Sequence, residues 1–114
     1  EVLWQATEIG INAAIPGATT FDVFNAMNKV ISEVSVAGNN VGRLGHGLGL
    51  QLTEPPSHRA EDKTVIKENM VLTIEPGLEY APGKMIVHEE NIIINEDGAE
   101  LITKRAPKEI PIIK

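Results

Sequence analysis

The chain has 114 residues, of which 42% are hydrophobic and 23% charged, a composition typical of one modest globular domain. Its formal net charge of −6 argues against nucleic acid or an anionic membrane surface as a partner. It contains no cysteine, which excludes disulfides and thiolate metal ligands and favours a reducing compartment, so we expect a cytoplasmic protein. No apolar run approaches the ~20 residues that a transmembrane helix needs.

Two helices are predicted in the first third of the chain. Residues 3–15 place apolar side chains at helical spacing, and a proline–glycine pair then ends the pattern. Thr19 and Asp22 have the spacing of a capping box, ahead of an amphipathic segment that runs to about Val34. The segment Gly38–Asn40 is expected to break this second helical pattern.

The rest of the chain is predicted to form an antiparallel sheet. Glycine and proline punctuate residues 42–56, which we expect to be irregular backbone with short extended pieces, and the polar residues 57–69 are expected to form a surface loop. Apolar runs then predict strands, the last of which pairs back across a turn as a hairpin, at residues 70–74, 84–88, 91–94 and 100–103. Two helices followed by a mostly antiparallel sheet define an α+β fold.

A histidine within a glycine-rich stretch is the first candidate for chemistry. His46 stands among four glycines, at positions 42, 45, 47 and 49. Glycines let a backbone approach a ligand closely and adopt positive φ. A histidine there has little to pack against, so it is either a surface residue of a flexible loop or a ligand or catalytic group.

Two further segments carry carboxylates at strand ends. Glu75 follows an apolar run and precedes a proline–glycine pair, which suits a metal ligand or general base as well as a solvent-exposed strand end. Glu89 and Glu90 lie between apolar runs, and side-chain alternation sends them to opposite faces. If Glu90 shares a face with Ile92 and Ile94, Glu89 lies on the other. A charge in so apolar a segment is paired, is bound to a metal, or prevents another strand from pairing at an exposed sheet edge.

One histidine and two glutamates on separate segments make a set of hard, oxygen-rich ligands for a divalent ion. Their spacing does not fix the number of ions. His58 lies in a Pro-Pro-Ser-His-Arg segment, and we interpret it as a loop residue rather than a ligand.

The order of these segments resembles the catalytic domain of the pita-bread metallohydrolases, the family of prolidase, aminopeptidase P, methionine aminopeptidase and creatinase. The resemblance covers nearly the whole chain and rests on Gly-His-Gly-Leu-Gly at 45–49, Thr-Ile-Glu-Pro-Gly at 73–77 and His-Glu-Glu-Asn at 88–91. It implies the C-terminal half of a pita-bread fold. It also implies a hydrolase similar to Xaa-Pro dipeptidase or aminopeptidase P, acting on a short peptide or small molecule.

Carried over residue by residue, the resemblance implies that His46, Glu75 and Glu89 are metal ligands, with His46 and Glu75 also catalytic. In the family, two aspartates further upstream complete a set that holds two divalent ions, here manganese, cobalt, zinc or iron. No residue of this chain matches those aspartates, and the chain opens at Glu1 without a methionine. Residues 1–114 are therefore expected to be a partial catalytic domain, inactive and weak in metal binding by itself. A homodimer is expected to cover its open edges.

Three neighbours of the implied ligands depart from the family pattern. Thr53 stands seven residues after His46, where the peptidases carry a histidine, and its hydroxyl could donate a hydrogen bond in that role. Glu79 takes the place of a tyrosine and Val87 that of an arginine. These changes raise two alternatives: a creatinase-like hydrolase or lyase of a small zwitterionic compound, or a binding module without catalysis.

Overall fold

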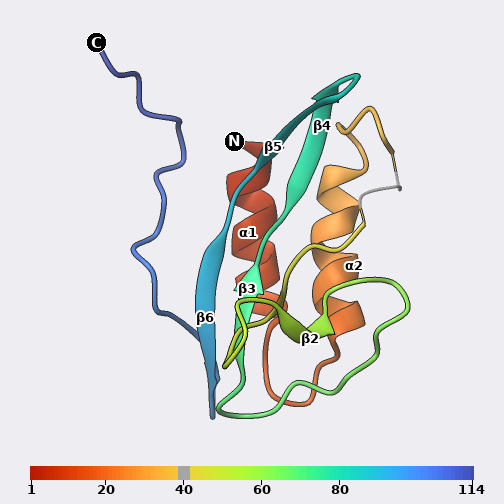
Figure 1. Ribbon diagram of the computed structural model, residues 1–114, viewed down its shortest axis with the longest axis vertical. Helices are drawn as coiled ribbons and strands as arrows, with labels where there is room; N and C mark the ends of the chain where they lie inside the picture. The colour runs from red at the N-terminus through yellow and green to blue at the C-terminus, as the bar shows by residue number, and fades with distance from the viewer. Residues whose placement is uncertain (39–41) are drawn as a thin grey trace.

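The computed structural model describes residues 1–38 and 42–114, which form two helices packed on one face of a sheet (Figure 1). The predicted break at Gly38–Asn40 therefore lies mostly outside the described residues. The elements in chain order are α1 (Val2–Ala13), α2 (Thr20–Ile31), β1 (His46–Gly47), β2 (Glu54–Ser57), β3 (Val71–Ile74), β4 (Gly77–Ala81), β5 (Lys84–Val87), β6 (Glu90–Asn95) and β7 (Gly98–Leu101).

The capping box predicted for the second helix is present. The Thr19 hydroxyl accepts a hydrogen bond from the Asp22 N–H at 3.1 Å, and the Asp22 carboxylate accepts one from the Thr19 N–H at 2.8 Å. The helix ends at Ile31, earlier than predicted, because the chain turns there towards β4. The Val36 N–H donates to the Glu79 carbonyl at 2.9 Å, and Val34 is left exposed.

Five strands form one antiparallel sheet in the order β2-β1-β3-β6-β7, and β4 and β5 form a separate hairpin. The α+β class and the hairpin across residues 95–98 are confirmed. Three strands were not predicted. Strands β1 and β2 lie in the segment expected to be irregular with short extended pieces. Strand β4 begins directly after Pro76, which has no N–H to donate and so ends the ladder of β3.

The core lies between the two helices and the main sheet. Helix α1 packs closely on α2 and β3 at Gly10, which has no side chain. A Cβ at this position would lie 2.7 Å from the Met27 sulfur and 2.9 Å from Ile74 Cγ2. The polar segment 57–69 is a loop as predicted, but it is not wholly on the surface. His58 and Ile66 are buried, since the loop folds back against the start of α2.

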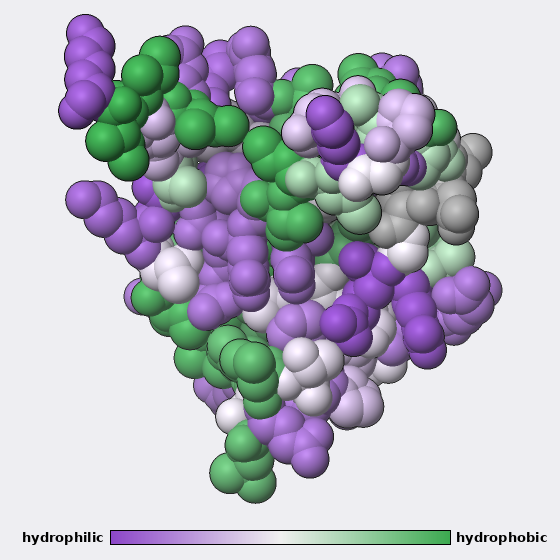
Figure 2. All heavy atoms as spheres, turned by 45° about the horizontal axis from the view of Figure 1, so that its top comes forward, coloured by the Kyte–Doolittle hydropathy of each residue, from purple (hydrophilic) through white to green (hydrophobic). Residues whose placement is uncertain are grey.

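The surface carries scattered exposed apolar side chains. On the face shown in Figure 2, apolar side chains form separate patches around a largely hydrophilic middle. Neither α1 nor α2, the two helices of the described residues, is long and apolar enough to cross a bilayer.

Candidate metal centre

Three neighbouring strands bring His46, Glu75 and Glu89 together at one end of the main sheet. His46 opens β1, Glu75 follows β3 and Glu89 precedes β6. Ile74 pairs with Glu90 in the antiparallel register of β3 and β6, which places Glu75 opposite Glu89. One ligand atom from each of the three side chains lies within 4.8 Å of the others.

The ring of His46 is oriented by a hydrogen bond that it donates to the backbone. Its Nδ1 lies 2.8 Å from the Gly47 carbonyl oxygen, which can only accept, so Nδ1 carries the proton. In the neutral ring, Nε2 then presents its lone pair to Glu75 Oε2 at 3.4 Å. The His46 N–H donates to the Thr73 hydroxyl at 3.0 Å, which holds the backbone of β1 in place. This is the tautomer that a metal-ligating histidine requires.

These donors fit a divalent cation. A neutral imidazole nitrogen that faces a carboxylate oxygen is an arrangement of two electron-pair donors, and a cation between them removes their repulsion. His46 is buried, whereas Glu75 is half-buried and Glu89 is exposed, so the group opens to solvent on one side. Three protein ligands leave coordination positions for water or a substrate.

Glycine is required immediately before the histidine. Gly45 has φ +136°, in the region that favours glycine, and a Cβ there would overlap the Thr73 carbonyl oxygen and the His58 ring. A Cβ at Gly47 would overlap the Pro55 carbonyl oxygen of β2. The glycine pattern around His46 thus lets β1 lie tightly between β2 and β3.

The other candidate residues are not part of this group. Thr53 is exposed on the segment that leads into β2, whose Glu54 pairs with Gly47. Glu79 lies along β4, and its side chain accepts from the Gly83 N–H at 2.6 Å in the hairpin turn. Val87 is exposed at the end of β5.

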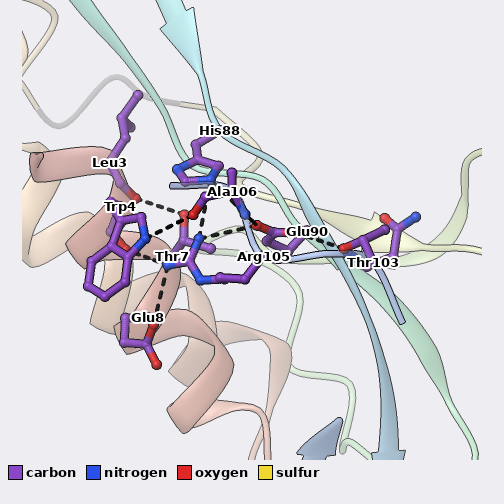
Figure 3. Close-up of polar contacts among 10 residues, drawn as sticks. Leu3, Trp4, Thr7, Glu8, His88, Glu90, Thr103, Arg105 and Ala106 are labelled. Atoms are coloured by element: carbon purple, nitrogen blue, oxygen red, sulfur yellow. Dashed lines mark hydrogen bonds and ion pairs between the residues drawn. The ribbon is translucent and has the colours of Figure 1, made fainter. Parts of the chain in front are cut away.

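A second polar cluster lies on the opposite side of Glu89, and the sequence did not predict it. Glu90 is only 2% exposed, and it shares its buried face with Ile92 and Ile94 as side-chain alternation predicted. Its carboxylate binds Arg105 and neighbouring groups of the C-terminal segment (Figure 3). Burial alone would raise the pKa of Glu90, but hydrogen bonds from Ala106, Thr103 and Arg105 lower it.

His58 is a buried neutral residue behind β1, and its titration gives a testable prediction. Burial lowers the pKa of His58 to about 4, from about 6.5 in an unfolded chain. Below pH 6.5 the unfolded state therefore takes up a proton before the folded state does. We expect the free energy of unfolding to fall by up to about 3 kcal/mol between pH 6.5 and pH 4 and the His58 contribution to level off below that.

Urea unfolding of the wild type and of His58→Leu across pH 4 to 7 measures this effect. The variant should lose most of the pH dependence in that window. An equal slope in both proteins would show that His58 is protonated in the folded state.

Comparison with known proteins agrees with this geometry. Residues 1–96 match metallopeptidase family M24. The chain is 37% identical over 105 residues to the Xaa-Pro dipeptidase of Pyrococcus furiosus, covering 91% of this chain and 30% of that protein. The structure of an Xaa-Pro dipeptidase from Bacillus anthracis superposes with a TM-score of 0.85 at 33% identity, covering 98% of this chain and 31% of that one.

A methionine aminopeptidase from Rickettsia prowazekii shares the fold, with a TM-score of 0.71 at 22% identity, over 88% of this chain and 49% of that one. The chain belongs to metallopeptidase family M24 and has the C-terminal half of its pita-bread fold. It spans about 30% of the length of the curated relatives that it matches. Family membership implies divalent metal ions, and the group of His46, Glu75 and Glu89 offers ligands for them.

Proposed function

We propose that this chain is part of the catalytic domain of a metal-dependent Xaa-Pro dipeptidase. The observation that carries the proposal is the convergence of His46, Glu75 and Glu89 within 4.8 Å, in a chain 37% identical to an Xaa-Pro dipeptidase. Residues 1–114 form one portion of that domain. The remaining ligands, two aspartates, come from elsewhere in the whole protein and complete a site for two ions of manganese, cobalt, zinc or iron.

In this proposal the three side chains have separate roles. His46 binds through Nε2, because its Nδ1–H is engaged by the Gly47 carbonyl. Glu75 and Glu89 would bind through one carboxylate oxygen each. The second oxygen of either carboxylate could then accept a proton from the attacking water. Divalent ions held by these residues would lower the pKa of a coordinated water and polarise the scissile carbonyl.

Thr53 is the residue that we propose to donate a hydrogen bond to the developing oxyanion. Its hydroxyl is a single neutral donor, whereas a histidine can donate as a cation. The presence of Thr53, where the peptidases carry a histidine, favours a second candidate function: a creatinase-like hydrolase or lyase of a small zwitterionic compound. The relatives named dipeptidase favour the peptidase over that alternative.

Turnover of an Xaa-Pro dipeptide by the whole protein with added manganese or cobalt tests the proposal. We expect cleavage that chelation abolishes, and a Thr53→His variant with activity equal to or above that of the wild type. Bound metal without cleavage, together with turnover of creatine, would support the second candidate instead. Light scattering on the same preparation tests the homodimer, which we propose because Leu50 and Leu52 are exposed beside β1.

A further inference from the structure

We propose that Arg105 is a positioning residue for the metal centre, because it anchors the two residues that flank Glu89. This inference rests on the proposed function, since it treats Glu89 as a metal ligand. It concerns a part of the chain that lies beyond residues 1–96, the range matched by the family.

The buried carboxylate of Glu90 is fully engaged by the C-terminal segment. Its Oε1 accepts from the Thr103 hydroxyl at 2.7 Å, and its Oε2 accepts from the Ala106 N–H at 2.8 Å and from Arg105 Nη1 at 3.2 Å. A charge that is 2% exposed is stable only with such partners. These bonds fix the first residue of β6.

The guanidinium of Arg105 joins this strand to helix α1. Its Nη2 donates to the Trp4 carbonyl at 3.0 Å and to the Glu8 carboxylate at 3.3 Å, and its Cζ lies 4.6 Å from the Trp4 ring centre. The Trp4 indole N–H in turn donates to the Ala106 carbonyl at 3.1 Å. Figure 3 shows Arg105 between the helix and Glu90. The guanidinium is therefore held from both sides and cannot easily rotate away.

The same guanidinium also binds the residue on the other side of Glu89. Arg105 Nη1 lies 3.2 Å from His88 Nε2, and because arginine only donates, the imidazole accepts. The His88 N–H donates to the Pro76 carbonyl at 3.0 Å, next to Glu75. Both neighbours of Glu89 are thus tied to one cation on the face opposite the metal-binding group.

The orientation of the Glu89 side chain depends on the residues on either side of it. It is exposed, so burial in the core does not hold its side chain, and it stands in the two-residue connection between β5 and β6. Alternation along the extended chain sends His88 and Glu90 to one side and Glu89 to the other. Fixing His88 and Glu90 therefore orients the Glu89 carboxylate towards the other two ligands. Loss of such a supporting contact costs about 10- to 100-fold in metal affinity.

Titration of the whole protein with manganese alone tests this role. We expect Arg105→Met to weaken manganese binding about tenfold, and Arg105→Lys, which keeps the charge, to recover part of that loss. The matched control is Glu8→Ala, which removes one partly exposed contact of Arg105 with α1 and leaves its contacts with Trp4 and Glu90 in place. It should leave manganese affinity within about twofold, because the guanidinium stays anchored by Trp4 and an exposed ion pair contributes little.

The outcomes separate this inference from the proposed function. If the wild type binds no manganese, the metal function fails and the inference fails with it. If the wild type and Arg105→Met bind manganese equally while the melting temperature falls, Arg105 is only structural and the inference alone is overturned. If Arg105→Met does not fold, Thr103→Val at an exposed residue removes the hydrogen bond that the hydroxyl donates to Glu90 Oε1 and the one that it accepts from the Asn91 N–H. Unchanged manganese affinity in that variant would overturn the inference as well.

Discussion

Replacing Glu75 with glutamine in the whole protein is expected to lower Xaa-Pro dipeptidase activity by at least about 100-fold and to weaken metal binding. Glutamine has the same shape but no charge, so the backbone bond from the Glu75 N–H to the Leu44 carbonyl at 3.0 Å remains. The loss of activity therefore measures the contribution of the carboxylate charge and not a change in the fold. The substitution removes one of the three ligands that we propose among the described residues, and the one that faces His46 Nε2 at 3.4 Å.

Steady-state kinetics at several manganese concentrations measures this effect. Higher manganese should restore part of the activity if the defect is in binding. Glu96→Gln, at an exposed glutamate in the turn between β6 and β7, is the matched control and should behave as wild type. Wild-type activity in Glu75→Gln would mean that Glu75 is not a ligand.

The second large effect is expected at Gly45. A Gly45→Ala variant adopts a φ of +136° only with strain, and its Cβ overlaps the Thr73 carbonyl oxygen and the His58 ring. Strain of about 1–3 kcal/mol and overpacking of a similar size together predict a loss of about 2–6 kcal/mol in the free energy of unfolding. Relief of the overlap would push β1 away from β3, so His46 should also lose its place beside Glu75.

Chemical denaturation of the whole protein measures this loss, with Gly17→Ala as the control. Gly17 also has positive φ, +91°, but a Cβ there meets nothing within 4 Å. The control should therefore show only the backbone cost, about 1 kcal/mol. Equal destabilisation in both variants would show that backbone conformation, and not the contact with Thr73, makes glycine necessary at position 45.

Local sequence patterns predicted the elements whose stability is local. The apolar spacing gave α1, the Thr19–Asp22 pair gave the start of α2, and the turn at residues 95–98 gave the β6–β7 hairpin. The missed features depend on partners in other segments of the chain. Strand β2 exists because Glu54–Ser57 pairs with β1, and Val36 leaves the helical path because it bonds to Glu79. Such pairings leave no periodicity in the segment itself.

The same distinction applies to the functional residues. His46, Glu75 and Glu89 lie in short motifs whose order identified the family, and the structure brings them together. Arg105 lies in a polar tail that has no motif, and its partners Trp4 and Glu8 are about a hundred residues away in the chain. Only the fold shows that it binds Glu90. The burial of His58 was missed for the same reason, because its segment is polar and the residues that cover it are distant.

The most direct test of the central claim is a manganese titration of the whole protein, by calorimetry, beside a His46→Ala variant. The account predicts saturable binding in the wild type that approaches two ions per chain, and binding weakened by at least about tenfold in the variant. It also predicts that the same titration raises the melting temperature of the wild type, because the ions bind the folded state. Equal manganese affinity in the two proteins would contradict the assignment of His46, Glu75 and Glu89 as the metal centre.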